Sequence, residues 1–152
     1  MERRFADDFI ICKMDLEAAS SFLNDVLGKE KESVQYYANH KTFMGQVLLE
    51  KKEERYSVLT KCKENLDFVI NVLKEYINQE STQANATLSY KPRKFIFHSD
   101  LGKYQTEVIK VKKRIETLRW TASMTGDEEK KALYQECVEK LNYVYSHIAK
   151  KS

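Results

Sequence analysis

The N-terminal part of the chain carries one apolar stripe with the spacing of a helix. Apolar side chains recur there at alternating steps of four and three residues, which places them on one face of an α-helix. The stripe consists of Phe5, Phe9, Cys12, Leu16, Ala19, Leu23 and Val26. Gly28 follows it, and glycine is favoured just after helix ends because it adopts the left-handed conformation without strain. The pattern therefore predicts a first helix over residues 3–27.

Residues 30–79 contain two apolar stripes on either side of the fully polar run 50–55. Their members are Val34, Tyr37, Met44 and Leu48 before the run, and Tyr56, Leu59, Cys62, Leu66, Val69, Ile70, Leu73, Tyr76 and Ile77 after it. No proline interrupts the stretch, and Gly45 is its single glycine. A glycine inside a helix costs about 1 kcal/mol, which tertiary packing can offset. We expect one long helix over 30–79; the alternative is a break at Gly45 into helices over 30–44 and 46–79.

Residues 80–102 have the composition of a long connection. The run 81–87 is small and polar, and Pro92 blocks a helix because it lacks a backbone N–H. Phe95 and Phe97 alternate with their neighbours in the manner of a short extended segment. A structureless connection of this length is uncommon in a compact domain and is often functional.

Two further stripes predict a pair of helices at the C-terminal end. They consist of Tyr104, Val108, Val111, Ile115, Leu118 and Ala122, and of Tyr134, Cys137, Leu141, Val144 and Ile148. The stripes predict helices over about 102–124 and 127–150. Between them, Gly126 suits a helix end and Asp127 suits an N-cap. Because the turn is so short, the two helices should pack antiparallel.

These patterns together predict an all-α fold, with residues 1–152 forming a single antiparallel helical bundle. It should contain at least one long helix and coiled-coil-like packing, with four helices, or five if the chain breaks near Gly45. The four Gly and one Pro in 152 residues are too few for the turns of a β-rich fold. If the first helix or the 34–48 section extends beyond the C-terminal pair, its apolar face needs a covering, supplied by the chain itself or by a partner.

Composition excludes several other classes of protein. A chain that is 42% hydrophobic and 11% aromatic with a net charge of +3 is not typical of disorder. No apolar run approaches the roughly 20 residues of a membrane span, and the N-terminus has no signal-peptide pattern. Cys12, Cys62 and Cys137 are odd in number and widely spaced, which indicates reduced, buried thiols. We therefore expect an intracellular and cytoplasmic protein.

Positive charge gathers in residues 91–119, which hold nine Lys or Arg against three Asp or Glu. Interleaved aromatic side chains make the region suitable for an acidic protein, lipid headgroups or nucleic acid. A solvated helix face with loop aromatics packed on the bundle explains the same pattern. The overall isoelectric point of about 8.6 makes nucleic acid the least favoured partner. The candidate partner-binding residues are Tyr90, Arg93, Lys94, Phe95, Phe97, Lys110, Lys112, Lys113 and Arg114.

Signals of catalysis are weak. Arg93 and His98 have the Arg-x4-His spacing and in this respect resemble the HEPN ribonucleases, which carry the pair on a helix lining a groove, whereas Pro92 predicts a loop here. The chain has no phosphate-binding glycine loop, no HExxH and no ExxH pair of the di-iron kind. We expect no enzymatic activity, no cofactor and no metal site. Trp120 lies beside the apolar stripe of its helix, and we expect it at the edge of the core; the alternative is a position at an interface.

The function expected from these observations is that of a non-catalytic protein–protein interaction module. Such a module is a scaffold, an adaptor or a subunit of a helical complex, and it binds a protein partner or itself through its apolar stripes. The first alternative is a binder of anionic surfaces through residues 91–119. The second is a helical-bundle enzyme such as a nuclease that depends on His98.

Overall fold

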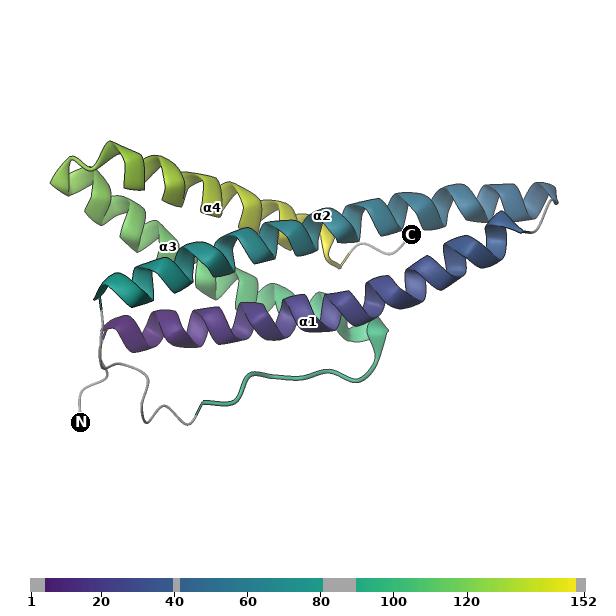
Figure 1. Ribbon diagram of the computed structural model, residues 1–152, viewed down its shortest axis with the longest axis horizontal. Helices are drawn as coiled ribbons and strands as arrows, with labels where there is room; N and C mark the ends of the chain where they lie inside the picture. Colours follow the sequence, from purple (N-terminus) through teal and green to yellow (C-terminus); the bar gives the residue numbers. More distant parts are fainter. Residues whose placement is uncertain (1–4, 40–41, 81–89, 150–152) are drawn as a thin grey trace.

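The computed structural model describes residues 5–39, 42–80 and 90–149. Within them the chain forms two helical hairpins, and the expected all-α antiparallel bundle is confirmed (Figure 1). The first hairpin consists of α1 (Phe5–Ala38) and α2 (Phe43–Glu80). The second consists of α3 (Gln105–Thr125) and α4 (Glu128–His147), preceded by a short 3₁₀-helix, η1 (His98–Tyr104). The hairpins pack together mainly through α2 and α4.

The predicted end of the first helix at residue 27 is wrong, because α1 continues through Gly28 to Ala38. Gly28 does not adopt a positive φ, and open space surrounds the position that a Cβ would occupy there. A glycine in helical conformation costs only about 1 kcal/mol. None of the next ten residues is another glycine or a proline, so nothing stops the helix at this point.

The predicted helix over 30–79 is also wrong, because α1 ends at Ala38 and α2 begins at Phe43. Thr42 marks the start of α2: its Oγ1 accepts a hydrogen bond from the Gly45 N–H at 3.0 Å, and its carbonyl accepts one from the Gln46 N–H at 3.0 Å. This is the geometry of an N-cap. Gly45 therefore lies in the first turn of α2. The break predicted as the alternative does occur, but it lies N-terminal to Gly45, between Ala38 and Phe43. The two shifted boundaries leave four α-helices in the described residues.

The core is built from the predicted apolar stripes. The largest fully buried side chains come from both hairpins: Phe9, Leu16, Leu23, Val26, Leu59, Leu66, Leu73, Leu101, Tyr104, Ile115, Leu141 and Ile148. The three cysteines are free and buried, as expected, and burial raises the pKa of each thiol to about 12. No described helix is long and apolar enough to cross a membrane.

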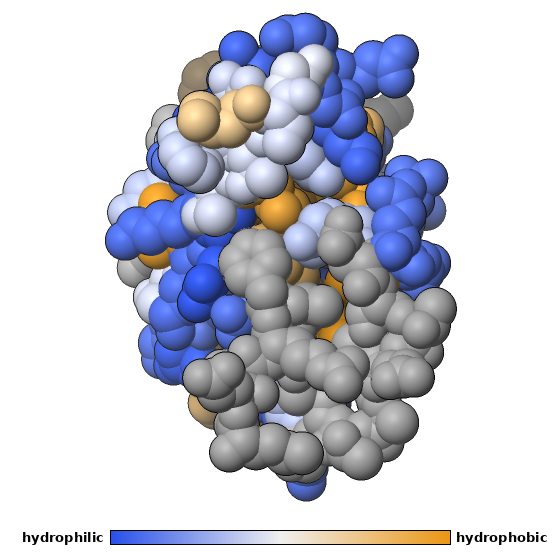
Figure 2. All heavy atoms as spheres, turned by 90° about the vertical axis from the view of Figure 1, so that its left-hand side faces the viewer, coloured by the Kyte–Doolittle hydropathy of each residue, from blue (hydrophilic) through white to orange (hydrophobic). Residues whose placement is uncertain are grey.

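The turn between α3 and α4 follows its predicted chemistry. Gly126 has a φ of 75°, and its N–H bonds the Ser123 carbonyl at 3.3 Å. Asp127 then caps α4, because its Oδ1 accepts a hydrogen bond from the Lys130 N–H at 3.1 Å. Seen from this end, the surface at the turn is mostly hydrophilic, and hydrophobic atoms are visible in the seam below it (Figure 2). The cap fixes the direction in which α4 returns along α3.

Candidate interaction surfaces

The segment 90–97 runs as an extended strap alongside α1 (Figure 1). At its start, the Tyr90 hydroxyl donates a hydrogen bond to Oδ1 of Asp15 in α1. Further along, Nη1 of Arg93 lies 3.8 Å from Oε1 of Glu107 in α3. Two predicted partner-binding residues, Tyr90 and Arg93, thus attach the strap to the bundle.

Phe95 fastens the same strap through an aromatic cluster. Its ring meets the Tyr104 ring edge-on at 4.9 Å between centroids, and the Phe22 ring of α1 at 6.4 Å. The charged groups of Arg93 and Lys103 lie over the Phe95 ring at 5.0 and 5.6 Å. Phe95 therefore packs against the chain's own core. Of the predicted aromatic candidates in this segment, Phe97 is the exposed one.

Two carboxyl groups lie buried beneath the strap. Asp15 and Glu107 are 6% and 5% exposed. Burial raises the pKa of Asp15, the hydrogen bond from Tyr90 lowers it, and the nearby Glu107 charge raises it again. Burial and Asp15 together raise the pKa of Tyr90 to about 12. Oε2 of Glu107 accepts no hydrogen bond from the described part of the chain. The pair was not anticipated from the sequence, because it joins residues far apart along the chain.

Several of the predicted basic residues are held in ion pairs. In α3, Lys112 lies 3.8 Å from Glu116, and Arg114 lies 3.6 Å from Asp8 of α1. These pairs are partly exposed and contribute at most about 1 kcal/mol each, but they reduce the positive charge presented to a partner.

Lys110 and Lys113 are the exposed lysines of the same helix. They share a groove between α1 and α3, whose lining residues are Asp8, Ile11, Cys12, Asp15, Lys110, Lys113, Arg114 and Thr117. Because acidic and basic side chains both line it, the groove is less basic than the sequence run predicts. Lys94, on the strap, is exposed as well.

Arg93 and His98 have different neighbours in the structure. Arg93 lies against Glu107 and Phe95, whereas the His98 ring lies 5.7 Å from Phe22 at the start of η1. Within the described ranges, no group of three or more His, Cys, Asp or Glu side chains has the arrangement of a metal site. The raised thiol pKa values leave the cysteines in their weakly reactive protonated form.

A second surface lies at the end of the α1–α2 hairpin, which extends beyond α3 and α4 (Figure 1). We call the described residues of Gly28–Val58 the hairpin end. The last buried side chain before it is Leu27 and the first after it is Leu59. Within it, no described side chain is buried, although several are apolar. Its exposed or half-buried apolar residues are Val34, Tyr36, Tyr37, Ala38, Phe43, Met44, Val47, Leu48, Leu49, Tyr56 and Val58, and of these Tyr56 and Val58 pack against the core.

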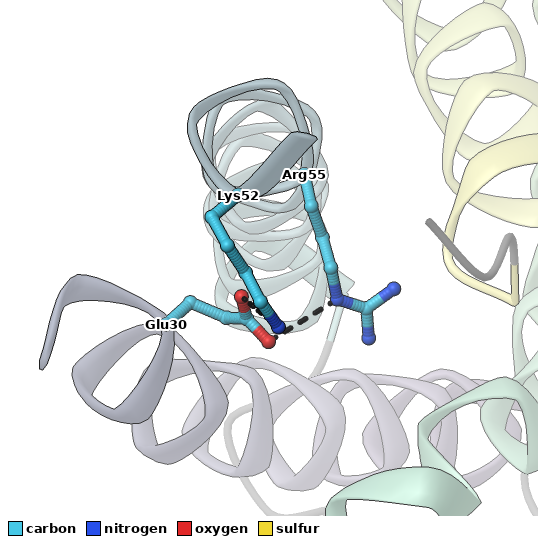
Figure 3. A network of polar contacts seen from close by, with 3 residues as sticks. All are labelled: Glu30, Lys52 and Arg55. Carbon is cyan, nitrogen blue, oxygen red and sulfur yellow. Dashed lines mark hydrogen bonds and ion pairs between the residues drawn. The ribbon is translucent and has the colours of Figure 1, made fainter. Parts of the chain in front are cut away.

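An ionic network marks the base of the hairpin end. Oε1 of Glu30 in α1 accepts a hydrogen bond from Nε of Arg55 in α2 at 3.2 Å, and Oε2 lies 3.8 Å from Nζ of Lys52 (Figure 3). The Glu30 side chain is only 14% exposed. All three residues line a cleft that also contains residues of η1 and Ile148. The network therefore joins α1 to α2 where the second hairpin ends.

The sequence predicted only part of this surface. It showed that apolar positions in 34–48 would need a covering if they extended beyond the C-terminal helices, and the structure places them there. The expectation for Trp120 is wrong, because its side chain is 65% exposed near the α3–α4 turn instead of lying at the core edge. Met124, one turn further along α3, is also exposed.

Comparison of the chain with protein-family models, with curated proteins and with solved structures found no match.

Proposed function

We propose that the protein is a non-catalytic protein–protein interaction module whose contact surface is the hairpin end. One observation carries this proposal: both helices of the hairpin end carry apolar side chains, yet no described side chain between Leu27 and Leu59 is buried. A helix buries its apolar face only against another layer of structure. In the rest of the protein α3 and α4 supply that layer, and at the hairpin end a partner would supply it.

The composition of the hairpin end supports the same proposal. Tyr36, Phe43 and Met44 are all exposed, and Phe43 is 81% exposed. Aromatic residues and methionine are enriched at the centres of protein interfaces. Large exposed apolar groups that cluster, in contrast to scattered ones, mark interaction sites on otherwise polar surfaces.

The hairpin end is also held in a defined shape before any partner arrives. Its two helices continue without interruption from the core, and the Glu30–Arg55 hydrogen bond joins them at its base. A preformed surface avoids much of the conformational entropy that a flexible segment loses on binding. The arrangement supports recognition by docking of a rigid surface.

The proposal is tested by photo-crosslinking in cells that express the protein. A photoreactive phenylalanine analogue at Phe43 should form a discrete protein adduct, and adding Met44→Glu should remove it because an interface core excludes charge. The matched control places the analogue at Trp120, an exposed aromatic residue on the other hairpin. No adduct at position 43, or one that Met44→Glu leaves unchanged, contradicts the proposal.

A second candidate function is binding of an anionic surface, and the exposed Lys110 and Lys113 in one groove support it. Binding of phosphatidylserine vesicles should then weaken steeply as salt rises. The double variant Lys110→Glu/Lys113→Glu should abolish binding, and it spares the ion-paired Lys112 and Arg114. The control Lys130→Glu/Lys131→Glu on α4 should leave binding intact. Binding that is insensitive to salt contradicts this function.

A further inference from the structure

The hairpin end has the chemistry of a self-complementary surface. Its described residues include five Lys or Arg and five Glu, with both signs present on each helix. Lys41, outside the described residues, adds one positive charge. A second hairpin end therefore meets almost no net repulsion there. The basic residues 91–119 differ, because nine Lys or Arg against three acidic residues would repel a second copy.

The helical geometry also fits a second copy. Each hairpin end offers two antiparallel helices with apolar side chains on both, and this is half of a four-helix bundle. Two copies related by a two-fold axis would place the same patch on each side of the interface, as closed dimers require. The protein already covers the other part of α1–α2 in this way, by packing a second helical hairpin against it.

We propose that the partner of the hairpin end is a second copy of this chain, and that two hairpin ends pack face to face as a four-helix bundle. This inference rests on the proposed function and names its partner. Phe43 and Met44 lie within the interface, and the exposed Trp120 and Met124 of the second hairpin lie outside it.

Sedimentation of the purified full chain over a range of concentrations tests the inference. The wild type should approach twice the mass of 17.9 kDa as its concentration rises. Phe43→Glu/Met44→Glu should raise the dissociation constant at least about tenfold, since it places charge in the interface centre. The matched control Trp120→Glu/Met124→Glu should dimerise as the wild type does. Because apolar burial drives the association, high salt should leave the dimer intact.

Circular dichroism shows whether each variant keeps its helical fold. Phe43 and Met44 are exposed, so their substitution should leave the helical signal unchanged, and a monomer with a native signal supports the inference. A wild type that stays monomeric at every concentration overturns it, as does a dimer that only the Trp120 variant disrupts. If the wild type is monomeric but position 43 crosslinks to a different protein, the inference fails and the proposed function stands. If position 43 captures nothing either, both fail.

Discussion

Removing the carboxylate of Glu30 should loosen the hairpin end while leaving the core intact. Glu30 is the acidic member of the network that joins α1 to α2 at the base of the hairpin end, with Arg55 Nε at 3.2 Å and Lys52 Nζ at 3.8 Å. Beyond this point no described buried side chain holds the two helices together. Glu30→Ala therefore removes one specific tie between α1 and α2.

The size of the effect follows from the burial of the network. A hydrogen bond to a charged group contributes about 1.5–3 kcal/mol, and a fully exposed ion pair contributes about 0–1 kcal/mol. The side chains of Glu30, Arg55 and Lys52 are 14%, 19% and 30% exposed, which lies between these cases. We expect Glu30→Ala to destabilise the hairpin end by about 1–2 kcal/mol.

Hydrogen–deuterium exchange read by mass spectrometry measures this locally. A loss of about 1.4 kcal/mol makes amides that open locally exchange about tenfold faster. Peptides from the hairpin end should show this acceleration, and peptides around the buried Leu16, Leu66 and Leu141 should not. The matched control is Glu32→Ala, because Glu32 is 71% exposed and pairs with Lys29 of its own helix at 3.8 Å. The control should change exchange little.

Three results would refute this reasoning. The first is an equal acceleration in all helices, which would mean that Glu30 supports the whole fold. The second is unchanged exchange in the hairpin end. The third is an effect of Glu32→Ala as large as that of Glu30→Ala, which would mean that burial of the network adds nothing.

Three further predictions concern the rest of the fold. Asp15→Asn should stabilise the protein at neutral pH, because burial raises the pKa of Asp15 above its ordinary value of 3.8 and the amide can still accept from Tyr90. The wild-type free energy of unfolding should fall as pH rises from 3.8 through the raised pKa, and it should then level off. Urea titrations should therefore show that the difference in unfolding free energy between Asp15→Asn and the wild type becomes smaller in acid. The three buried thiols should resist alkylation at neutral pH until the protein unfolds, and rapid labelling of the native state would contradict their burial. Gly126→Ala should cost about 1 kcal/mol in a denaturant titration, because an L-residue is strained at a φ of 75°.

The apolar periodicity predicted the core well because burial acts on one face of each helix. Leu16, Leu66, Ile115 and Leu141 all lie on predicted stripes and all are buried. The apolar periodicity predicted the helix boundaries less well. Gly28 permits a helix end without requiring one, and the sequence between the end of α1 at Ala38 and the start of α2 at Phe43 contains no glycine or proline. Its signal is Thr42, an N-cap residue in front of an apolar pair, which is weak by itself.

The interaction surfaces depend on contacts that spacing does not reveal. Tyr90 and Asp15 are 75 positions apart, and no local pattern links them. The same holds for Phe95, whose place in the aromatic cluster follows from the path of the strap. Exposure at the hairpin end depends on where α3 and α4 stop relative to α1 and α2. The dependence of exposure on these helix ends could be recognised from the sequence, but only the tertiary structure shows which residues lie beyond α3 and α4.

The most direct test of the account is an electron–electron dipolar measurement on singly spin-labelled protein. A nitroxide at Gln46→Cys lies on the exposed part of the hairpin end. The native cysteines should not be labelled, because they are buried and the pKa of each thiol is raised to about 12. Because each chain carries one label, coupling arises only between two copies. If two hairpin ends pack together, a label at position 46 should give a resolved coupling, and a label at Glu129→Cys, next to the α3–α4 turn, should give a weaker one. No coupling at position 46, or a stronger one at 129, would contradict the claim that hairpin ends meet.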